Sequence, residues 1–173
     1  MNISNNAKQK PKWTVYCFFA AIILAVVAAG LYFSYRQSIS SEFGHNEAYF
    51  GEAFEELYAM SDTDTDFVQP TIDKAYQALT NIGAGEEFGL LSRYCIDPSV
   101  YPDASQIDAE LELICVGTDG NEAYVWVAYH QSVYAEDGAL VTASGTKDSR
   151  ILSRWSLENV NGEWTISEIK EKP

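Results

Sequence analysis

The stretch YVWVAYHQSVY, from Tyr124 to Tyr134, decides the fold predicted for this chain. Aromatic and β-branched residues dominate it, and these residue types favour β-strands. The stretch is also long enough to cross a whole sheet. The sequence therefore predicts one long strand here.

Another strand is predicted just before this one. From Ile107 to Cys115, apolar residues alternate with three acidic residues. That alternation is typical of a strand with one face in water. The turn-forming residues from Thr118 to Asn121 separate the two strands.

Further strands are predicted after the long one, with a turn at Glu136 to Gly138 leading into them. The pair Asn161-Gly162 is the strongest short hairpin signal in the chain, because these residues accept the left-handed backbone of a tight turn. The predicted strands cover residues 139–143, 151–160 and 164–169.

Three helices are predicted ahead of the strands. The first has apolar residues three and four positions apart from Tyr49 to Tyr58. The second starts near Pro70, carries apolar residues on one face as far as Ile82 and stops at the glycine that follows. A third, shorter helix is predicted from Glu86 to Tyr94, and Pro98 closes this half of the chain.

Helices first and an antiparallel meander second predict an α+β fold, in which the helices cover one face of a curved sheet. The residues YVWVAYH at Tyr124–His130 and the hairpin RWSLENVNGEWTISEI at Arg154–Ile169 resemble the nuclear transport factor 2-like superfamily (NTF2-like). Trp155 and Trp164 flank the hairpin turn much as in that superfamily. The resemblance covers residues 42–170 and implies a cone-shaped fold, but no single function, because this fold hosts enzymes, binders and assembly modules.

An apolar segment near the N-terminus predicts a membrane anchor. The run WTVYCFFAAIILAVVAAGLYF, from Trp13 to Phe33, contains no charge. An uninterrupted helix of this length spans about 30 Å, which is the thickness of the hydrocarbon core of a bilayer. Aromatic residues mark both ends, where such rings prefer the level of the lipid head groups. We place the transmembrane helix at residues 13–35.

The flanking charges predict the orientation of this single-pass helix. Three lysines precede it, whereas only Arg36 follows closely. Positive flanks stay in the cytoplasm, so we interpret the helix as an uncleaved signal-anchor in the cell membrane. A cleaved signal peptide is the alternative, although its apolar core would be unusually long. The predicted parts are a cytoplasmic tail at 1–12, a stalk at 36–41 and an extracytoplasmic domain at 42–173.

The remainder of the chain is strongly acidic. All 25 Asp and Glu residues lie from Glu42 onward, and the formal net charge is −14. Such a domain repels nucleic acid phosphates, so DNA or RNA binding is not expected. The chain has no glycine-rich phosphate loop, paired-cysteine zinc motif or serine nucleophile motif, so no cofactor or metal is expected.

Asp62, Asp64 and Asp66 have the spacing of the first ligands in a helix-loop-helix calcium site. Such a site needs glycine at its sixth position and glutamate at its twelfth, where this chain has Phe67 and Asp73. We therefore interpret the segment as an exposed acidic connector.

The chain has three cysteines, and Cys17 lies in the apolar helix. Cys95 and Cys115 belong to the domain. They pair in a disulfide if the domain faces an oxidising compartment, or remain as two buried thiols, and the sequence leaves both alternatives open.

A ligand site is predicted on the long strand. Enzymes of the resembled superfamily use a polar pair, often Asp with Tyr or His, at the base of the cone. His130 shares a strand face with Tyr124 and Trp126, and a histidine beside aromatic rings can act as a general base. The alternative is a structural histidine that is hydrogen-bonded to a neighbour. We predict that Tyr124, Trp126 and Tyr129 line a cavity beside it.

These features favour a membrane-tethered extracytoplasmic module that binds a protein partner or a small ligand and is not an enzyme. One alternative is a structural subunit of an envelope-spanning assembly. The layout of a short tail, one span and this fold is similar to that of inner-membrane proteins of secretion and conjugation machines. A further alternative is a small-molecule isomerase or dehydratase with His130 as its base.

Overall fold

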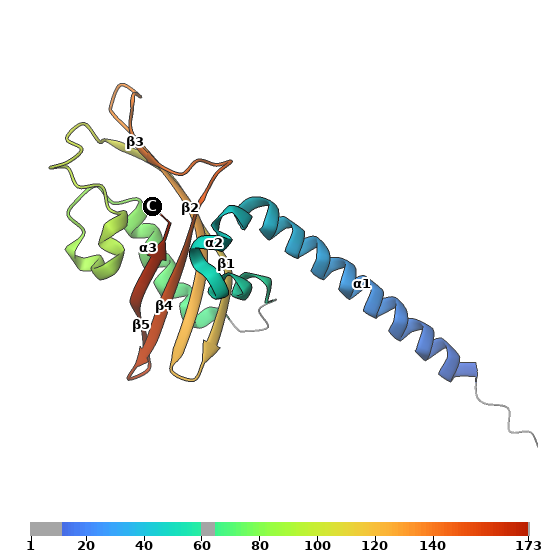
Figure 1. Ribbon diagram of the computed structural model, residues 1–173. Coiled ribbons are helices and arrows are strands. Elements are labelled where there is room, and N and C mark those ends of the chain that lie inside the picture. The colour runs from blue at the N-terminus through green and yellow to red at the C-terminus, as the bar shows by residue number, and fades with distance from the viewer. Residues whose placement is uncertain (1–11, 60–64, 173) are drawn as a thin grey trace, which may run out of the picture.

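A long helix projects from a domain that is built on a five-stranded antiparallel sheet (Figure 1). The computed structural model describes residues 12–59 and 65–172. Helical segments precede the strands along the chain. The predicted α+β class is therefore confirmed.

The strand order of the sheet is β1-β2-β4-β5, and β3 pairs with the end of β2 that β4 leaves free. Irregularities interrupt three of the ladders, and bulges of this kind bend a sheet. All the predicted strands are present. Their bounds are β1 (Gln106–Asp119), β2 (Glu122–Tyr134), β3 (Leu140–Ser144), β4 (Ile151–Val160) and β5 (Glu163–Glu171).

The β4–β5 hairpin turns at Asn161 and Gly162, as predicted. Their φ angles are 58° and 91°. Positive φ at both central residues is typical of a type I′ turn, whose twist matches that of the flanking strands. The turn therefore fixes the register of β5 on β4.

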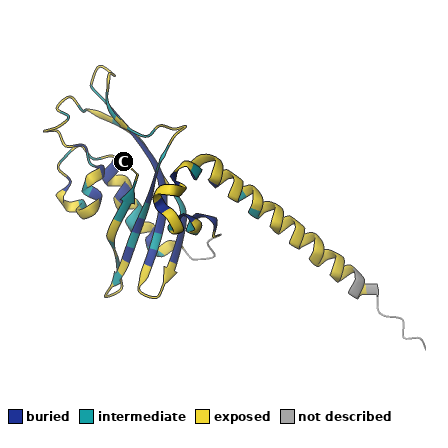
Figure 2. Cartoon of the chain, in the orientation of Figure 1, coloured by how far each residue is buried: buried dark blue, intermediate teal, exposed yellow. Residues whose placement is uncertain are grey.

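Strand β2 is buried on both of its faces. Val125 and Val127 lie on one face and Trp126 and Ala128 on the other, and all four are 0% exposed. The expectation that helices cover only one face of the sheet is therefore wrong. Since β2 is apolar on both faces, each face needs its own cover, and Figure 2 shows the buried residues along the strand.

The first face is covered by η3 (Asp66–Val68), α3 (Gln69–Leu79) and η4 (Glu86–Tyr94). Ala75 and Ala78 of α3 are fully buried against the sheet. Small residues at these positions let the helix axis approach the strands closely. This layer forms the larger of the two hydrophobic clusters.

The two segments on this face that were predicted as helices, α3 and η4, differ from their predicted form. Helix α3 stops before Ile82, because that residue leaves the helix and bridges to Ile96. The segment η4 has the predicted bounds, but it is a 3-10 helix with a kink at Gly89, where φ is 62°.

The second face is covered by the end of α1 and by η1 (Gly44–Asn46), α2 (Glu47–Phe50) and η2 (Gly51–Tyr58). The single helix predicted over residues 49–58 is wrong in form. Gly51 has a φ of 62°, which ends α2, and the chain continues as a 3-10 helix. The apolar residues of the segment nevertheless reach the core that Trp126 occupies.

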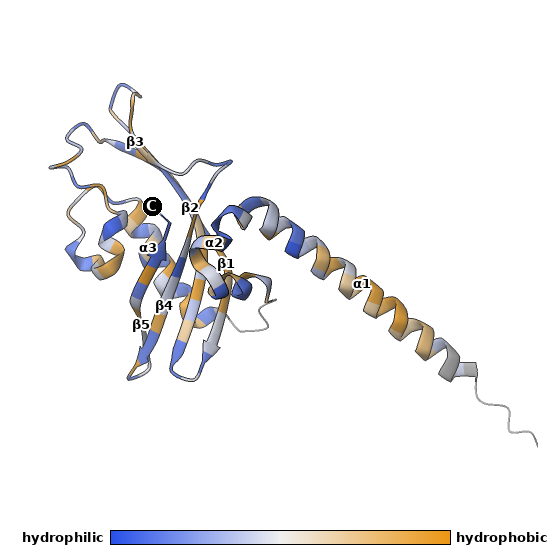
Figure 3. Cartoon of the chain, in the orientation of Figure 1, coloured by the Kyte–Doolittle hydropathy of each residue, from blue (hydrophilic) through white to orange (hydrophobic). Residues whose placement is uncertain are grey.

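Helix α1 (Lys12–Phe43) is long and apolar enough to cross a membrane. Figure 3 shows hydrophobic residues along its outer part and hydrophilic residues where it reaches the domain. Large apolar side chains on the outer part face away from the protein, and Leu24 is 69% exposed. That surface matches the membrane helix predicted at residues 13–35.

Residues 36–41, which were predicted as a stalk, lie within α1 and continue the helix into the domain. Ile39 and Phe43 are buried there, at 6% and 1% exposure. The carboxylate of Glu42 accepts two hydrogen bonds from Arg150, at 2.9 and 2.6 Å. The helix therefore joins the domain through packed and ion-paired side chains.

Side chains at the C-terminal end of the predicted span and directly after it also contact η2. The hydroxyl of Tyr35 donates to the carbonyl of Leu57 at 2.9 Å. The guanidinium of Arg36 lies 4.2 Å from the ring centre of Tyr58, which is within cation–π range. The domain thus begins to contact α1 where its apolar segment ends.

Replacing Phe43 by alanine should lower the free energy of unfolding by about 3 to 5 kcal/mol, because a buried ring leaves a cavity. Chemical denaturation of the full chain in detergent micelles measures this. Leu140→Ala is the control, since Leu140 is 60% exposed, and it should change stability by about 0.5 kcal/mol or less. Equal stability of the two variants would show that the end of α1 does not belong to the folded domain.

Candidate functional site

The structure divides the predicted site residues between the two faces of β2. Tyr124, Trp126 and His130 lie on the face that α1 and η2 cover, whereas Tyr129 lies on the face that α3 and η4 cover. Successive strand residues point to opposite faces. Tyr124, Trp126 and Tyr129 therefore do not line one cavity.

Trp126 is a buried core residue. Its ring centre lies 4.7 Å from that of Phe50 and 6.4 Å from that of Phe54. Its indole N–H donates to the carboxylate of Glu56 at 2.8 Å. Arg154 donates two hydrogen bonds of 2.8 Å to the same carboxylate, and this hydrogen bonding raises the pKa of Arg154. The partly buried carboxylate is thus engaged by Trp126 and Arg154.

Tyr124 is half-buried beside a shallow hollow of about 260 Å³ that opens near the β1–β2 turn. The Arg154 guanidinium lies 5.5 Å from the centre of its ring. Burial raises the pKa of the Tyr124 phenol. The ring lies against Gly117, where a Cβ atom would overlap it. This hollow is small and its one cation, Arg154, is already paired with Glu56.

His130 is buried, with 1% of its surface exposed. Neither ring nitrogen has a hydrogen-bond partner among the described residues. The nearest carboxylate is that of Glu110 on β1, with Oε2 3.9 Å from Nδ1. The predicted hydrogen bond to a neighbour is therefore absent. An imidazole that is closed off from solvent is also poorly placed to act as a general base on a substrate.

Tyr129 belongs to a polar cluster on the opposite face. Its ring centre lies 5.1 Å from that of Tyr94. The Tyr94 hydroxyl donates to the carboxylate of Glu171 at 2.8 Å, and the indole N–H of Trp155 donates to Ser153 at 2.8 Å. Burial, and then the charge of Glu171, raise the pKa of both phenols. The cluster joins the end of β5 to η4 and was not predicted.

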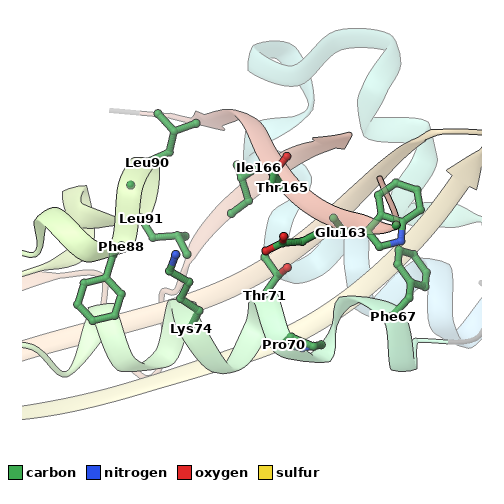
Figure 4. A pocket seen from close by; sticks show the side chains of 13 residues that line it. Phe67, Pro70, Thr71, Lys74, Phe88, Leu90, Leu91, Glu163, Thr165 and Ile166 are labelled. Atoms are coloured by element: carbon green, nitrogen blue, oxygen red, sulfur yellow. The ribbon is translucent and has the colours of Figure 1, made fainter. Parts of the chain in front are cut away.

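The principal candidate site is a groove that the sequence did not predict. It lies between α3, η4 and the start of β5, with a volume of about 440 Å³ (Figure 4). Lys74 rises from α3 into it. Its apolar lining side chains are Phe67, Phe88, Leu90, Leu91, Trp164 and Ile166.

The groove combines apolar walls with one positive charge, that of Lys74. The rings of Phe67 and Trp164 pack 5.0 Å apart at one end, and Leu90 is 51% exposed at the mouth. Among the described lining residues, Lys74 is the only basic one and Glu163 the only acidic one. Among residues 12–59 and 65–172, Lys74 forms no ion pair. Such a groove suits a mainly apolar group that carries a negative charge.

One sequence signal could have indicated this groove. Phe88, Leu90 and Leu91 lie within one short predicted helix, and a helix that packs on a sheet buries only one face. One of these three residues therefore has to remain at the surface, and in the structure it is Leu90. The contribution of Trp164 could not be seen, because β5 is distant from η4 in the sequence.

The described residues show no metal centre and no disulfide. Within residues 12–59 and 65–172, no three His, Cys, Asp or Glu side chains are grouped to hold a metal ion. Asp62 and Asp64 of the acidic motif lie outside the described residues. Cys95 and Cys115 are free thiols that pack against opposite faces of the sheet.

The fold and the site define an α+β domain that is carried on a potential membrane helix and has an open groove on the sheet face away from that helix. In comparisons with known proteins, no family model and no curated sequence matches the chain. Its function is therefore inferred from its own residues.

Replacing His130 by leucine should leave stability at pH 8 unchanged or raise it by up to about 1 kcal/mol, because a buried polar group without a partner is costly. The neighbouring Gln131 is the matched control. Its amide donates to the carbonyls of Leu79 and Tyr94, at 2.7 and 2.8 Å, so Gln131→Leu should cost about 1 to 3 kcal/mol. A similar loss in both variants, measured by thermal unfolding, would show that His130 has a partner.

The thiol of Cys115 should resist alkylation. Burial, and then the charge of Glu56, raise its pKa from 9.0 to about 12. At pH 8.5 the folded protein should react with iodoacetamide roughly 1000-fold more slowly than the unfolded chain, because the thiolate is the reactive form. The raised pKa also predicts that the contribution of this thiol to the free energy of unfolding is fully present below pH 9 and is lost as the pH rises toward 12.

A variant in which Cys17 and Cys95 are replaced by serine leaves Cys115 as the only thiol. Mass spectrometry after timed labelling gives the rate, and the same variant in denaturant gives the reference. Labelling of the folded protein at the rate of the denatured protein would contradict the buried position of Cys115.

Proposed function

We propose that this chain is a single-pass cell-membrane protein whose extracytoplasmic domain is a non-enzymatic binding module. In this proposal, α1 crosses the membrane with its N-terminus in the cytoplasm. The domain binds a protein partner or a small ligand in the groove that Lys74 enters.

The position of the groove carries this proposal. The end of α1 packs on one face of the sheet through Ile39 and Phe43. The groove is formed by elements that cover the other face. A helix fixed in a membrane therefore leaves the groove accessible, which is what a tethered binding domain needs.

The flanking charges support the orientation. Arg36 follows the apolar part of α1, whereas three lysines precede it. Moving a positive flank across the membrane is disfavoured, so the lysine-bearing end is expected to stay in the cytoplasm. The acidic domain, with its surplus of Asp and Glu residues, adds little to this preference because acidic residues contribute weakly to topology.

We also propose that the domain is NTF2-like. The order of helices before strands, the bulged sheet and the hairpin that carries Trp155 and Trp164 support this assignment. The cover on both faces of the sheet is an addition to the pattern expected from the resemblance, and it comes from the segment that joins the anchor to the domain.

A subunit of an envelope-spanning assembly is the second candidate function, and one observation favours it. The junction between α1 and the domain is helical and packed, with Arg36 over Tyr58 and Arg150 paired to Glu42. Such a junction holds the domain at a fixed angle to its anchor. A subunit of an assembly needs a fixed orientation of this kind in order to contact the neighbouring subunits. The isomerase alternative has less support, since its base, His130, is closed off from solvent.

The orientation predicts a specific pattern of proteolysis. Protease added to intact cells that carry the chain with a C-terminal epitope tag should remove the tag, because the domain is outside the cytoplasm. A tag on the N-terminus should survive until the membrane is opened. Both tagged forms should stay with the membrane after washing at high pH.

Immunoblots of the two tagged forms measure this pattern. Protection of the C-terminal tag in intact cells would contradict the orientation. Release of a soluble product whose N-terminus lies beyond residue 30 would instead show that the apolar segment is a cleaved signal peptide.

A further inference from the structure

Among the described residues, no strand pairs with the outer edge of β5, so the start of this strand is an open edge of the sheet. Strand β5 is the last in the order β1-β2-β4-β5. Val160 and Glu163 pair directly beside the two-residue turn, so their backbone groups bond to each other. By alternation along the ladder, Trp164 and Ile166 point their N–H and C=O groups away from β4. Their side chains line the groove.

The far end of the same edge is already occupied. The carbonyl of Ile169 accepts a hydrogen bond from Arg93 at 3.5 Å. The carbonyl of Glu171 accepts one from the hydroxyl of Tyr49. The available part of the edge is therefore confined to the start of β5, beside the groove.

An extended polypeptide matches this combination of groups. Its backbone presents donors and acceptors at the spacing of an edge strand, and its alternate side chains point into an adjoining groove. The apolar walls formed by Phe88, Leu90 and Ile166 suit an aliphatic or aromatic side chain. The ammonium of Lys74, which forms no ion pair within the described part of the chain, suits a carboxylate. A small ligand meets the last two requirements but cannot pair with the backbone of β5 over several residues, as an added strand does.

We propose that the groove and the edge at Trp164–Ile166 bind an extended segment of a protein partner, which adds to the sheet as a further strand. The segment places an apolar side chain beside Leu90 and an acidic side chain near Lys74. This inference rests on the proposed function, because it names the kind of partner that the same groove takes.

The test uses the full chain in lipid nanodiscs and a phage library of random decapeptides. Selected peptides are synthesised with a fluorescent label, and their affinities are measured by anisotropy. Peptides with alternating apolar residues and at least one Asp or Glu should be enriched. Leu90→Asp should weaken binding at least tenfold, whereas Leu140→Asp should not, although Leu90 and Leu140 are both exposed, at 51% and 60%.

Two further measurements are specific to strand addition. Lys74→Glu should weaken binding at least tenfold, while Lys74→Arg retains it because the charge remains. Residue-resolved hydrogen exchange should show slower exchange of the Trp164 and Ile166 amides when peptide is bound. The amides of Glu163 and Thr165 already pair with β4 and should not change.

The outcomes separate this inference from the proposed function. Peptides that bind equally well to the Leu90→Asp variant, or that leave the Trp164 and Ile166 amides unprotected, would overturn strand addition while leaving a binding module elsewhere on the domain. Enrichment of no peptide at all would overturn the inference as well. The protease pattern decides the orientation independently of both results.

Discussion

The burial of β2 on both faces is the constraint on which the rest of the structure depends. Its odd-numbered apolar residues belong to one hydrophobic cluster, and its even-numbered apolar residues belong to the other. A strand of this kind needs partners along both edges and cover above and below. Strands β1 and β4 supply most of the edges. The covers come from two different parts of the chain, α3 with η4 and the end of α1 with η2.

Among the described residues, the buried polar side chains in these layers are hydrogen-bonded, with one exception. The carboxylate of Glu56, which belongs to η2, accepts hydrogen bonds from Arg154 and Trp126 of the sheet. An ion pair that is partly buried, as this one is, contributes little net stability, but losing one partner is costly. It therefore fixes how η2 lies on the sheet. His130 is the exception, since no hydrogen bond satisfies its ring nitrogens among the described residues.

The strands and the hairpin at Asn161-Gly162 could be predicted because their signals are local: alternation, β-branched residues and turn chemistry. The helical half was predicted less well, since a glycine with positive φ, such as Gly51 or Gly89, ends or kinks a helix that apolar spacing alone would continue. The second cover of the sheet was missed because nothing local marks residues 36–43 as core. The groove was missed for a related reason. Lys74 and Trp164 come from separate segments that only the tertiary fold brings together.

Helix α1 continues into the domain as one uninterrupted helix from Lys12 to Phe43, and its end is packed in the domain core. Its 32 residues make a shaft about 48 Å long. Membrane helices adjust to bilayers of different thickness by tilting. If the outer part of α1 lies in a bilayer, any such tilt swings the whole domain through the same angle. The lipid composition, through the bilayer thickness, would then determine the distance of the groove from the membrane surface and its orientation relative to that surface.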